Sequence, residues 1–117
     1  MTEVFALLDD EIVQGMEREV GSDMLPILLQ SLRNEIVSAD KAMTAYLAED
    51  EIALLRNQAH ALKSAARSFG MLQLGEACFD IESAATGEVL LETIETLLVA
   101  FREVANSSLE KLDRDWL

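Results

Sequence analysis

His60 is the only histidine in this chain, and its surroundings are unusual for so acidic a protein. The sequence carries 22 Asp and Glu against 9 Lys and Arg, which gives a formal net charge of −13. Residues 52–75 nevertheless contain no carboxylate, and this window holds three cations, Arg56, Lys63 and Arg67. An imidazole among cations is suited to receiving an anion, because the cations stabilise the negative charge that arrives at the ring.

A helical wheel at about 100° per residue places these side chains on one face. The residues within roughly 60° of His60 are Arg56, Lys63, Ser64 and Arg67. The opposite face is apolar and comprises Leu55, Leu62, Ala66 and Phe69. The pattern therefore predicts that His60 is exposed on a helix, and that Ser64 and its small neighbours leave room for a second protein to approach the ring.

Three kinds of chemistry compete for this face. A zinc site needs three or four ligands and the chain has no second histidine, while a di-iron bundle would need Glu where Asn57 stands. A Cys–His pair is disfavoured because Cys78 falls on an apolar stripe, and no nucleophile elbow or P-loop is present. Phosphoryl transfer to a neutral imidazole fits better, with Lys63 and Arg67 holding the phosphoryl oxygens. On these residues alone, an inert surface histidine is an equally good interpretation.

Turn signals divide the chain into five segments, each with the apolar spacing of a helix. The expected helices span residues 3–19, about 25–47, 51–69, 71–85 and 88–114. No segment sustains the alternation of apolar and polar residues that is typical of a strand. The apolar residues are mostly Leu, Ile, Val, Met and Ala, which suits packed helices. We expect an all-α fold, an antiparallel four-helix bundle with a short additional N-terminal helix, as a single domain over residues 1–117.

The helix boundaries follow from capping residues. Ser22 or Asp23 is the expected N-cap of the second helix, with Pro26 in its first turn, and Asp50 is the expected N-cap of the third. Gly70 stands where glycine commonly ends a helix. The expected core includes, among others, Phe5, Leu8, Val13, Leu72, Leu90 and Leu91.

Composition excludes several classes of function. The acidic balance argues against binding to nucleic acid and to anionic membrane surfaces. The N-terminus has neither the basic start nor the apolar run of a signal peptide or membrane anchor. One cysteine rules out an internal disulfide and fits a reducing compartment, so we expect a cytoplasmic protein.

The stretch AHALKSAARSFGMLQLGEACFDIESAATGE, residues 59–88, resembles the signature of histidine-containing phosphotransfer (HPt) domains. Those domains are the relay modules of multistep two-component signalling. The stretch GSDMLPILLQSL, residues 21–32, resembles another conserved part of that family, so the likeness covers essentially the whole chain. The matching signature positions are Ala59, His60, Leu62, Lys63, Gly70, Leu74, Cys78, Ile81 and Glu82.

The resemblance implies a role for each matching residue. His60 would accept a phosphoryl group on Nε2 from a receiver-domain aspartyl phosphate and pass it to another receiver aspartate. Lys63 would screen the phosphoryl charge, and Glu82 would either orient the histidine or be a solvated acid. Arg67 falls at a variable position, so its role rests on the wheel alone. Ser64 stands where the family most often has glycine, which affects access to the ring and partner selectivity.

The resemblance also implies partners and a mode of action. They are receiver domains of a hybrid sensor kinase or a response regulator, which supply Mg²⁺, and the chain would be a phosphoryl carrier without cofactor or ATP-dependent kinase activity. The docking surface would be the His60 face plus Val4, Ala6, Leu7 and Val13, although Val13 is better suited to the core. Two alternatives stay open: a non-catalytic helical adaptor, and a piece of a larger kinase, although the initial Met and compact length favour a free-standing module.

Overall fold

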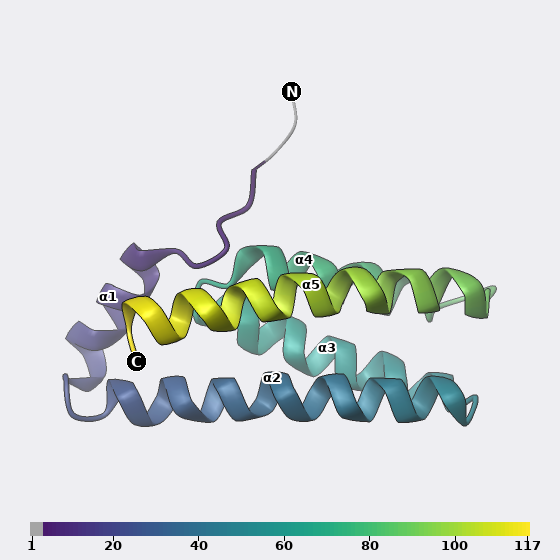
Figure 1. Ribbon diagram of the computed structural model, residues 1–117, viewed down its shortest axis with the longest axis horizontal. Coiled ribbons are helices and arrows are strands. Elements are labelled where there is room, and N and C mark those ends of the chain that lie inside the picture. The colour runs from purple at the N-terminus through teal and green to yellow at the C-terminus, as the bar shows by residue number, and fades with distance from the viewer. Residues whose placement is uncertain (1–3) are drawn as a thin grey trace.

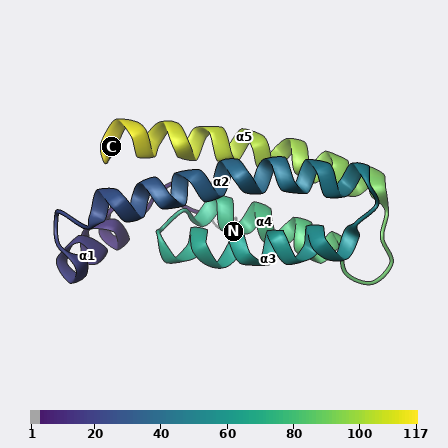
Figure 2. The same cartoon turned by 90° about the horizontal axis from the view of Figure 1, so that it is seen from below.

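Four antiparallel helices form a bundle, and a fifth, short helix precedes them (Figure 1). The computed structural model describes residues 4–117. The helices are α1 (Asp10–Val20), α2 (Leu25–Ala48), α3 (Ile52–Ser68), α4 (Leu72–Ala84) and α5 (Leu91–Asp115). Helices α2 and α4 each pack against both α3 and α5, as Figures 1 and 2 show, and α1 packs against the start of α2. The predicted all-α bundle with an additional N-terminal helix is confirmed.

The core lies between α2, α3, α4 and α5 and is built from the apolar stripes that the sequence displays. Helix α3 buries Leu55, Ala59, Leu62 and Ala66, the stripe opposite His60. Phe101 of α5 is the bulkiest fully buried side chain. Because the stripe takes up one side of α3, the other side, with His60, faces solvent. No helix within residues 4–117 combines the length and the apolar composition needed to cross a membrane.

The turn between α3 and α4 fixes the two helices that carry the site. Gly70 adopts φ 85°, a left-handed conformation that favours glycine, and its carbonyl accepts a 2.8 Å hydrogen bond from the Asp9 N–H. A Cβ on Gly70 would lie 3.0 Å from the Asp9 carbonyl oxygen. The N-terminal segment therefore closes over a turn that needs glycine for both its conformation and its space.

The first helix begins later than predicted. Residues 4–9 are not helical, and the predicted start at residue 3 lies outside the described residues. Hydrogen bonds to α4 hold this segment: the Gln73 N–H donates to the Ala6 carbonyl at 3.0 Å, and Gln73 Nε2 donates to the Phe5 carbonyl at 2.9 Å. The Asp9 side chain then caps α1 by accepting from the Glu11 N–H at 3.0 Å. Long-range bonds replace the helical bonds that the apolar spacing predicted.

Two predicted N-caps are also wrong. Met24, not Ser22 or Asp23, precedes α2 and makes no side-chain cap, while Pro26 does lie in the first turn. Glu51 precedes α3, because Asp50 is used to reverse the chain in a left-handed conformation, with φ 57°.

The predicted core is wrong at two leucines near the start of α5. Leu90 and Leu91 are exposed, because residues 85–90 form the connection and α5 starts only at Leu91. Leu72 is half-buried rather than buried.

Candidate functional site

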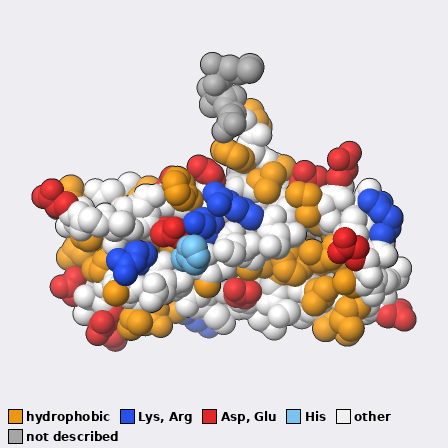
Figure 3. Space-filling model, turned by 180° about the vertical axis from the view of Figure 1, so that it is seen from behind, with side chains coloured by type: hydrophobic (Ala, Val, Ile, Leu, Met, Phe, Trp, Pro, Cys, Tyr) orange, Lys and Arg blue, Asp and Glu red, His pale blue; other side chains and the backbone are white. Residues whose placement is uncertain are grey.

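Glu82 of α4 joins His60 and Lys63 of α3. Its Oε2 lies 2.7 Å from His60 Nδ1, and its Oε1 accepts a hydrogen bond from Lys63 Nζ at 2.9 Å. His60 and Lys63 are one turn apart, so one carboxylate on the neighbouring helix reaches both. Figure 3 shows the histidine on an open face of the molecule, with carboxylate and cationic side chains beside it. Of the predicted site residues, the structure thus brings these three into direct contact.

The contact with Glu82 defines which nitrogen of His60 is available. An ionised carboxylate only accepts hydrogen bonds, so Nδ1 carries the hydrogen and donates it. In the neutral ring, Nε2 then keeps a free lone pair. The His60 side chain is 64% exposed, whereas Glu82 is only 19% exposed. The arrangement therefore anchors one edge of the imidazole and presents a nucleophilic nitrogen to solvent.

Glu82 is held in its charged form. The hydrogen bond from Lys63 is the largest cause that lowers the pKa of this carboxyl, and the hydrogen bond to His60 lowers it further, against the opposing effect of burial. A carboxylate that stays ionised can accept from His60 and stabilise positive charge on the ring. The predicted alternative of a fully solvated acid does not describe Glu82, because most of its side chain is covered.

Lys63 lies deeper than the wheel suggests. Its side chain is 13% exposed, and its ammonium lies 5.6 Å from the centre of the Phe79 ring, within the range of a cation–π contact. The charge of Lys63 is therefore positioned by its hydrogen bond to Glu82, one turn from His60, with the Phe79 ring beside it. An ammonium has three donors, so Lys63 can keep Glu82 and also receive an anion at the ring.

Arg67 lies one turn beyond Lys63 on α3 and contacts α4. Its guanidinium lies 5.9 Å from the Phe79 ring centre, and its Nη2 lies 3.7 Å from Glu76 Oε2. Gly75 permits this position, since a Cβ there would lie 2.8 Å from Arg67 Cγ. Arg67 therefore contacts α4 rather than His60, and it extends the cationic face by one turn.

Ser64 and Arg56 do not contact the imidazole through their side chains. The Ser64 hydroxyl donates to the His60 backbone carbonyl at 3.3 Å, which keeps its small side chain close to the helix. Arg56 Nη1 donates to the Ala85 carbonyl at 3.4 Å, at the end of α4. Ser64 therefore leaves access to the ring, and Arg56 serves mainly to tie α3 to α4.

Cys78 is excluded as a nucleophile. It is fully buried, and burial raises the pKa of its thiol to about 12. Thiolate is the reactive form of cysteine, so almost none is present near neutral pH. The expected role as a small core residue is confirmed.

The acid-free window of α3 is matched by acids on α4. Glu76, Phe79 and Glu82 are three residues apart and form one stripe, which faces α3. The sequence reasoning found Glu82 but missed Glu76 and Phe79. Their spacing of three was the available signal, and only the register between α3 and α4 shows which cations they meet.

The predicted docking residues of the N-terminal segment differ in accessibility. Val13 is fully buried, so its expected core role is confirmed and it offers no docking surface. Val4 is 92% exposed, while Ala6 and Leu7 are half-buried. These three residues lie in the segment that runs to α4, before α1 begins.

Comparison with known proteins agrees with this geometry. The Hpt domain family matches residues 23–115. The phosphorelay protein LuxU of Vibrio vulnificus is 31% identical over 97 residues, which cover 82% of this chain and 84% of that protein. LuxU of Vibrio harveyi is 31% identical over 86 residues, 74% of this chain and 75% of its own.

The fold has a counterpart among solved structures. The crystal structure of histidine-containing phosphotransfer protein B (HptB) from Pseudomonas aeruginosa PAO1 superposes with a TM-score of 0.86, at 21% identity and with 93% of each chain covered. At that identity the likeness concerns the fold. Together with the match over residues 23–115 and the identity to LuxU, it establishes that the chain belongs to the histidine-containing phosphotransfer (Hpt) domain family.

Proposed function

We propose that His60 carries the phosphoryl group in this chain, receiving it from one receiver-domain aspartate and passing it to another. Members of the Hpt family are phosphoryl carriers rather than kinases, and the chain is a phosphorelay intermediate. The observation that supports His60 as the carrier is its 2.7 Å contact with Glu82, which leaves Nε2 as the exposed nucleophile. No contact among residues 4–117 favours the alternative of an adaptor that never carries phosphate.

In the transfer step the Nε2 lone pair attacks phosphorus, an N–P bond forms, and the bond from phosphorus to the aspartyl oxygen breaks. The electron pair of that bond leaves with the aspartate carboxylate. Because Nδ1 keeps its hydrogen, the ring becomes positively charged, and ionised Glu82 stabilises it from 2.7 Å. Lys63 offsets the negative charge of the phosphoryl oxygens. Transfer onward is the same step in reverse.

We expect the receiver to supply the metal ion of the reaction. We assign the Mg²⁺ of the reaction to the receiver's acidic pocket, and we place no cofactor on this chain. The chain contributes the nucleophile, its orientation and part of the charge compensation. We expect the exchange to occur in the cytosol, where a free, buried Cys78 stays reduced.

The test is transfer from receiver domains of the source organism that have been phosphorylated with ³²P-labelled acetyl phosphate and Mg²⁺. We expect the label to move to this chain and to be acid-labile and alkali-stable, as a phosphohistidine is. A parent chain that stays unlabelled by every receiver, while a known Hpt protein is labelled in parallel, would reject the proposed function.

Glu82→Gln should slow transfer roughly 10- to 100-fold, the order of loss found when the partner that orients a metal-binding histidine is replaced. The amide oxygen can still accept from Nδ1, but it carries no charge to stabilise the ring. Rapid-quench measurement of single-turnover transfer checks this. Glu76→Gln is the matched control, because it removes an acid from the same stripe without touching His60. Equal rates for Glu82→Gln and the parent would remove Glu82 from the mechanism.

Acidification should lower the free energy of unfolding of the parent chain more than that of Glu82→Gln. The pKa of Glu82 is lower in the folded chain than its ordinary value, so its contacts stabilise the fold above that ordinary value. The stabilisation is lost as the pH falls from the ordinary value of a glutamate through the lowered pKa. Urea unfolding at steps of pH from neutrality downward measures the difference between the two proteins. A difference that stays constant down to the most acidic step would contradict the Lys63–Glu82 contact.

A further inference from the structure

Phe79 is the one exposed aromatic side chain among the described residues 4–117. It is 42% exposed, whereas Phe101 is fully buried and the other aromatic residues are half-buried or deeper. Its neighbours Cys78 and Ile81 face the core of the bundle. A partner that covers this ring gains the free energy of its burial.

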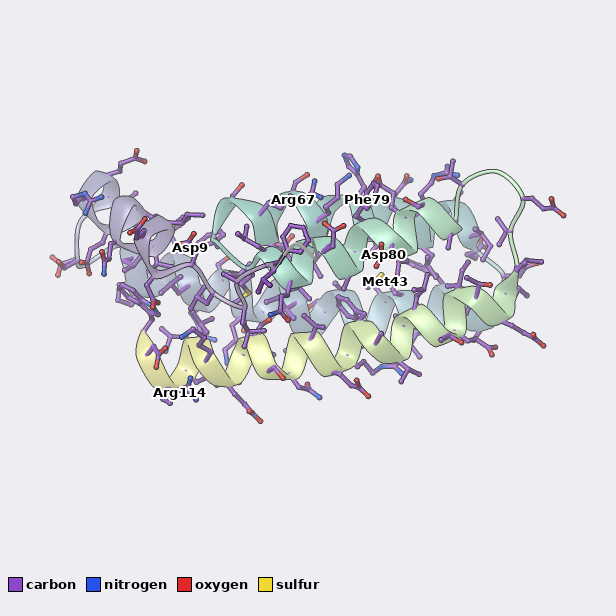
Figure 4. All side chains as sticks on the ribbon, turned by 90° about the horizontal axis from the view of Figure 1, so that it is seen from above. Asp9, Met43, Arg67, Phe79, Asp80 and Arg114 are labelled. Carbon is purple, nitrogen blue, oxygen red and sulfur yellow. The ribbon has the colours of Figure 1, made fainter. Side chains whose placement is uncertain are left out.

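Two cations of α3 lie over the ring. Lys63 Nζ lies 5.6 Å and Arg67 Cζ 5.9 Å from its centre, and these cations are themselves paired with Glu82 and Glu76. Figure 4 shows Arg67 and Phe79 on the same outer side of the bundle, away from α5. Phe79 is thus a positioned aromatic side chain, which loses little conformational freedom when a partner covers it.

The position of Phe79 places it inside any interface that serves His60. Phe79 lies one helical turn from Glu82, which contacts His60 directly. A protein interface of ordinary size covers about 800 Å² on each partner, equivalent to a disc of about 16 Å radius. A receiver that brings its aspartyl phosphate to Nε2 therefore covers Phe79 as well.

We infer that Phe79, which lies beside Lys63 and Arg67, is the aromatic anchor through which receiver domains dock. The anchor favours a receiver that presents an apolar side chain next to an acidic one, the first for the ring and the second for Arg67, whose side chain is 46% exposed. Phe79 is a specificity residue and not a catalytic residue, since the hydrogen bonds that position His60 and Lys63 come from Glu82. This inference rests on the proposed function and adds the means by which the partner is held.

The test varies the receiver concentration in the ³²P transfer assay and separates affinity from chemistry. Phe79→Ala should raise KM for the receiver at least about tenfold and leave the maximal rate within about twofold, as expected for loss of an aromatic hot spot. Phe79→Tyr should restore most of the affinity. Val99→Ala is the control, because Val99 is also an exposed apolar residue, at 54%, but lies on α5 rather than on the pair of helices that carries the site.

The outcomes distinguish docking from chemistry and from a failed fold. An unchanged KM for Phe79→Ala, or a lower maximal rate at unchanged KM, would overturn the inference. Circular dichroism of Phe79→Ala should show the same thermal midpoint as the parent, because the ring lies outside the core. If no receiver labels the parent chain, the proposed function fails, and calorimetric binding of unphosphorylated receivers to the parent and to Phe79→Ala still decides the docking role. Equal binding of the two proteins would overturn it.

Discussion

His60→Gln should abolish phosphoryl labelling of the chain and leave its thermal unfolding midpoint close to that of the parent. No other imidazole exists in the sequence to take over, and the buried thiol of Cys78 is protonated at neutral pH. The side chain of His60 is 64% exposed and contributes no core packing, so its loss removes one surface contact with Glu82. Surface substitutions of this kind change the free energy of unfolding by about 0.5 kcal/mol.

The measurement is ³²P transfer from a phosphorylated receiver, followed by acid and alkali treatment of the product, beside a thermal scan by circular dichroism. Asn57→Ala is the matched control, since Asn57 is exposed on the same helix one turn from His60. It should be labelled like the parent. Labelling of His60→Gln at the parent's level would show that another group carries the phosphate, and would refute the assignment of His60 as the carrier.

The exposure of His60 could be predicted from the sequence, because it depends only on the spacing of apolar residues along one helix. The apolar stripe of α3 fixes which side is buried, and His60 falls opposite to it whatever the neighbouring helices do. The order and number of the bundle helices were predictable for the same reason. Gly70 ends α3 as expected, since its left-handed conformation is a local requirement that the residue type reveals.

The features that the sequence did not reveal depend on contacts between distant segments. The start of α1 is set by hydrogen bonds from Gln73 to the backbone of Phe5 and Ala6, which no local pattern encodes. The pairing of Arg67 with Glu76 depends on the register of α3 against α4, and Gly75 leaves the space that the Arg67 side chain occupies in that register. A periodicity argument therefore finds which residues are exposed, but not which residues they contact.

Leu62→Ala should lower the free energy of unfolding by about 2–5 kcal/mol, the range for truncating a fully buried leucine. Leu62 is two residues from His60 but has no exposed surface, so the change leaves a cavity between α3 and the rest of the core. For a domain of this size the midpoint should fall by about 10 °C or more. Urea unfolding and thermal scans measure the loss, and Leu54→Ala, an exposed leucine on the same helix, should stay within about 0.5 kcal/mol of the parent.

The same variant tests whether the site depends on the core. Measured at a temperature where Leu62→Ala is fully folded, phosphoryl transfer should proceed at nearly the parent's rate, because His60, Lys63 and Glu82 hold one another on the outer face. His60→Gln and Leu62→Ala would then have opposite effects although a single residue separates the two positions. The first removes the chemistry and keeps the fold, and the second weakens the fold and keeps the chemistry. A large loss of transfer rate in folded Leu62→Ala would instead mean that the core sets the position of α3 against α4. The contacts of Glu82 alone would then be insufficient to orient the histidine.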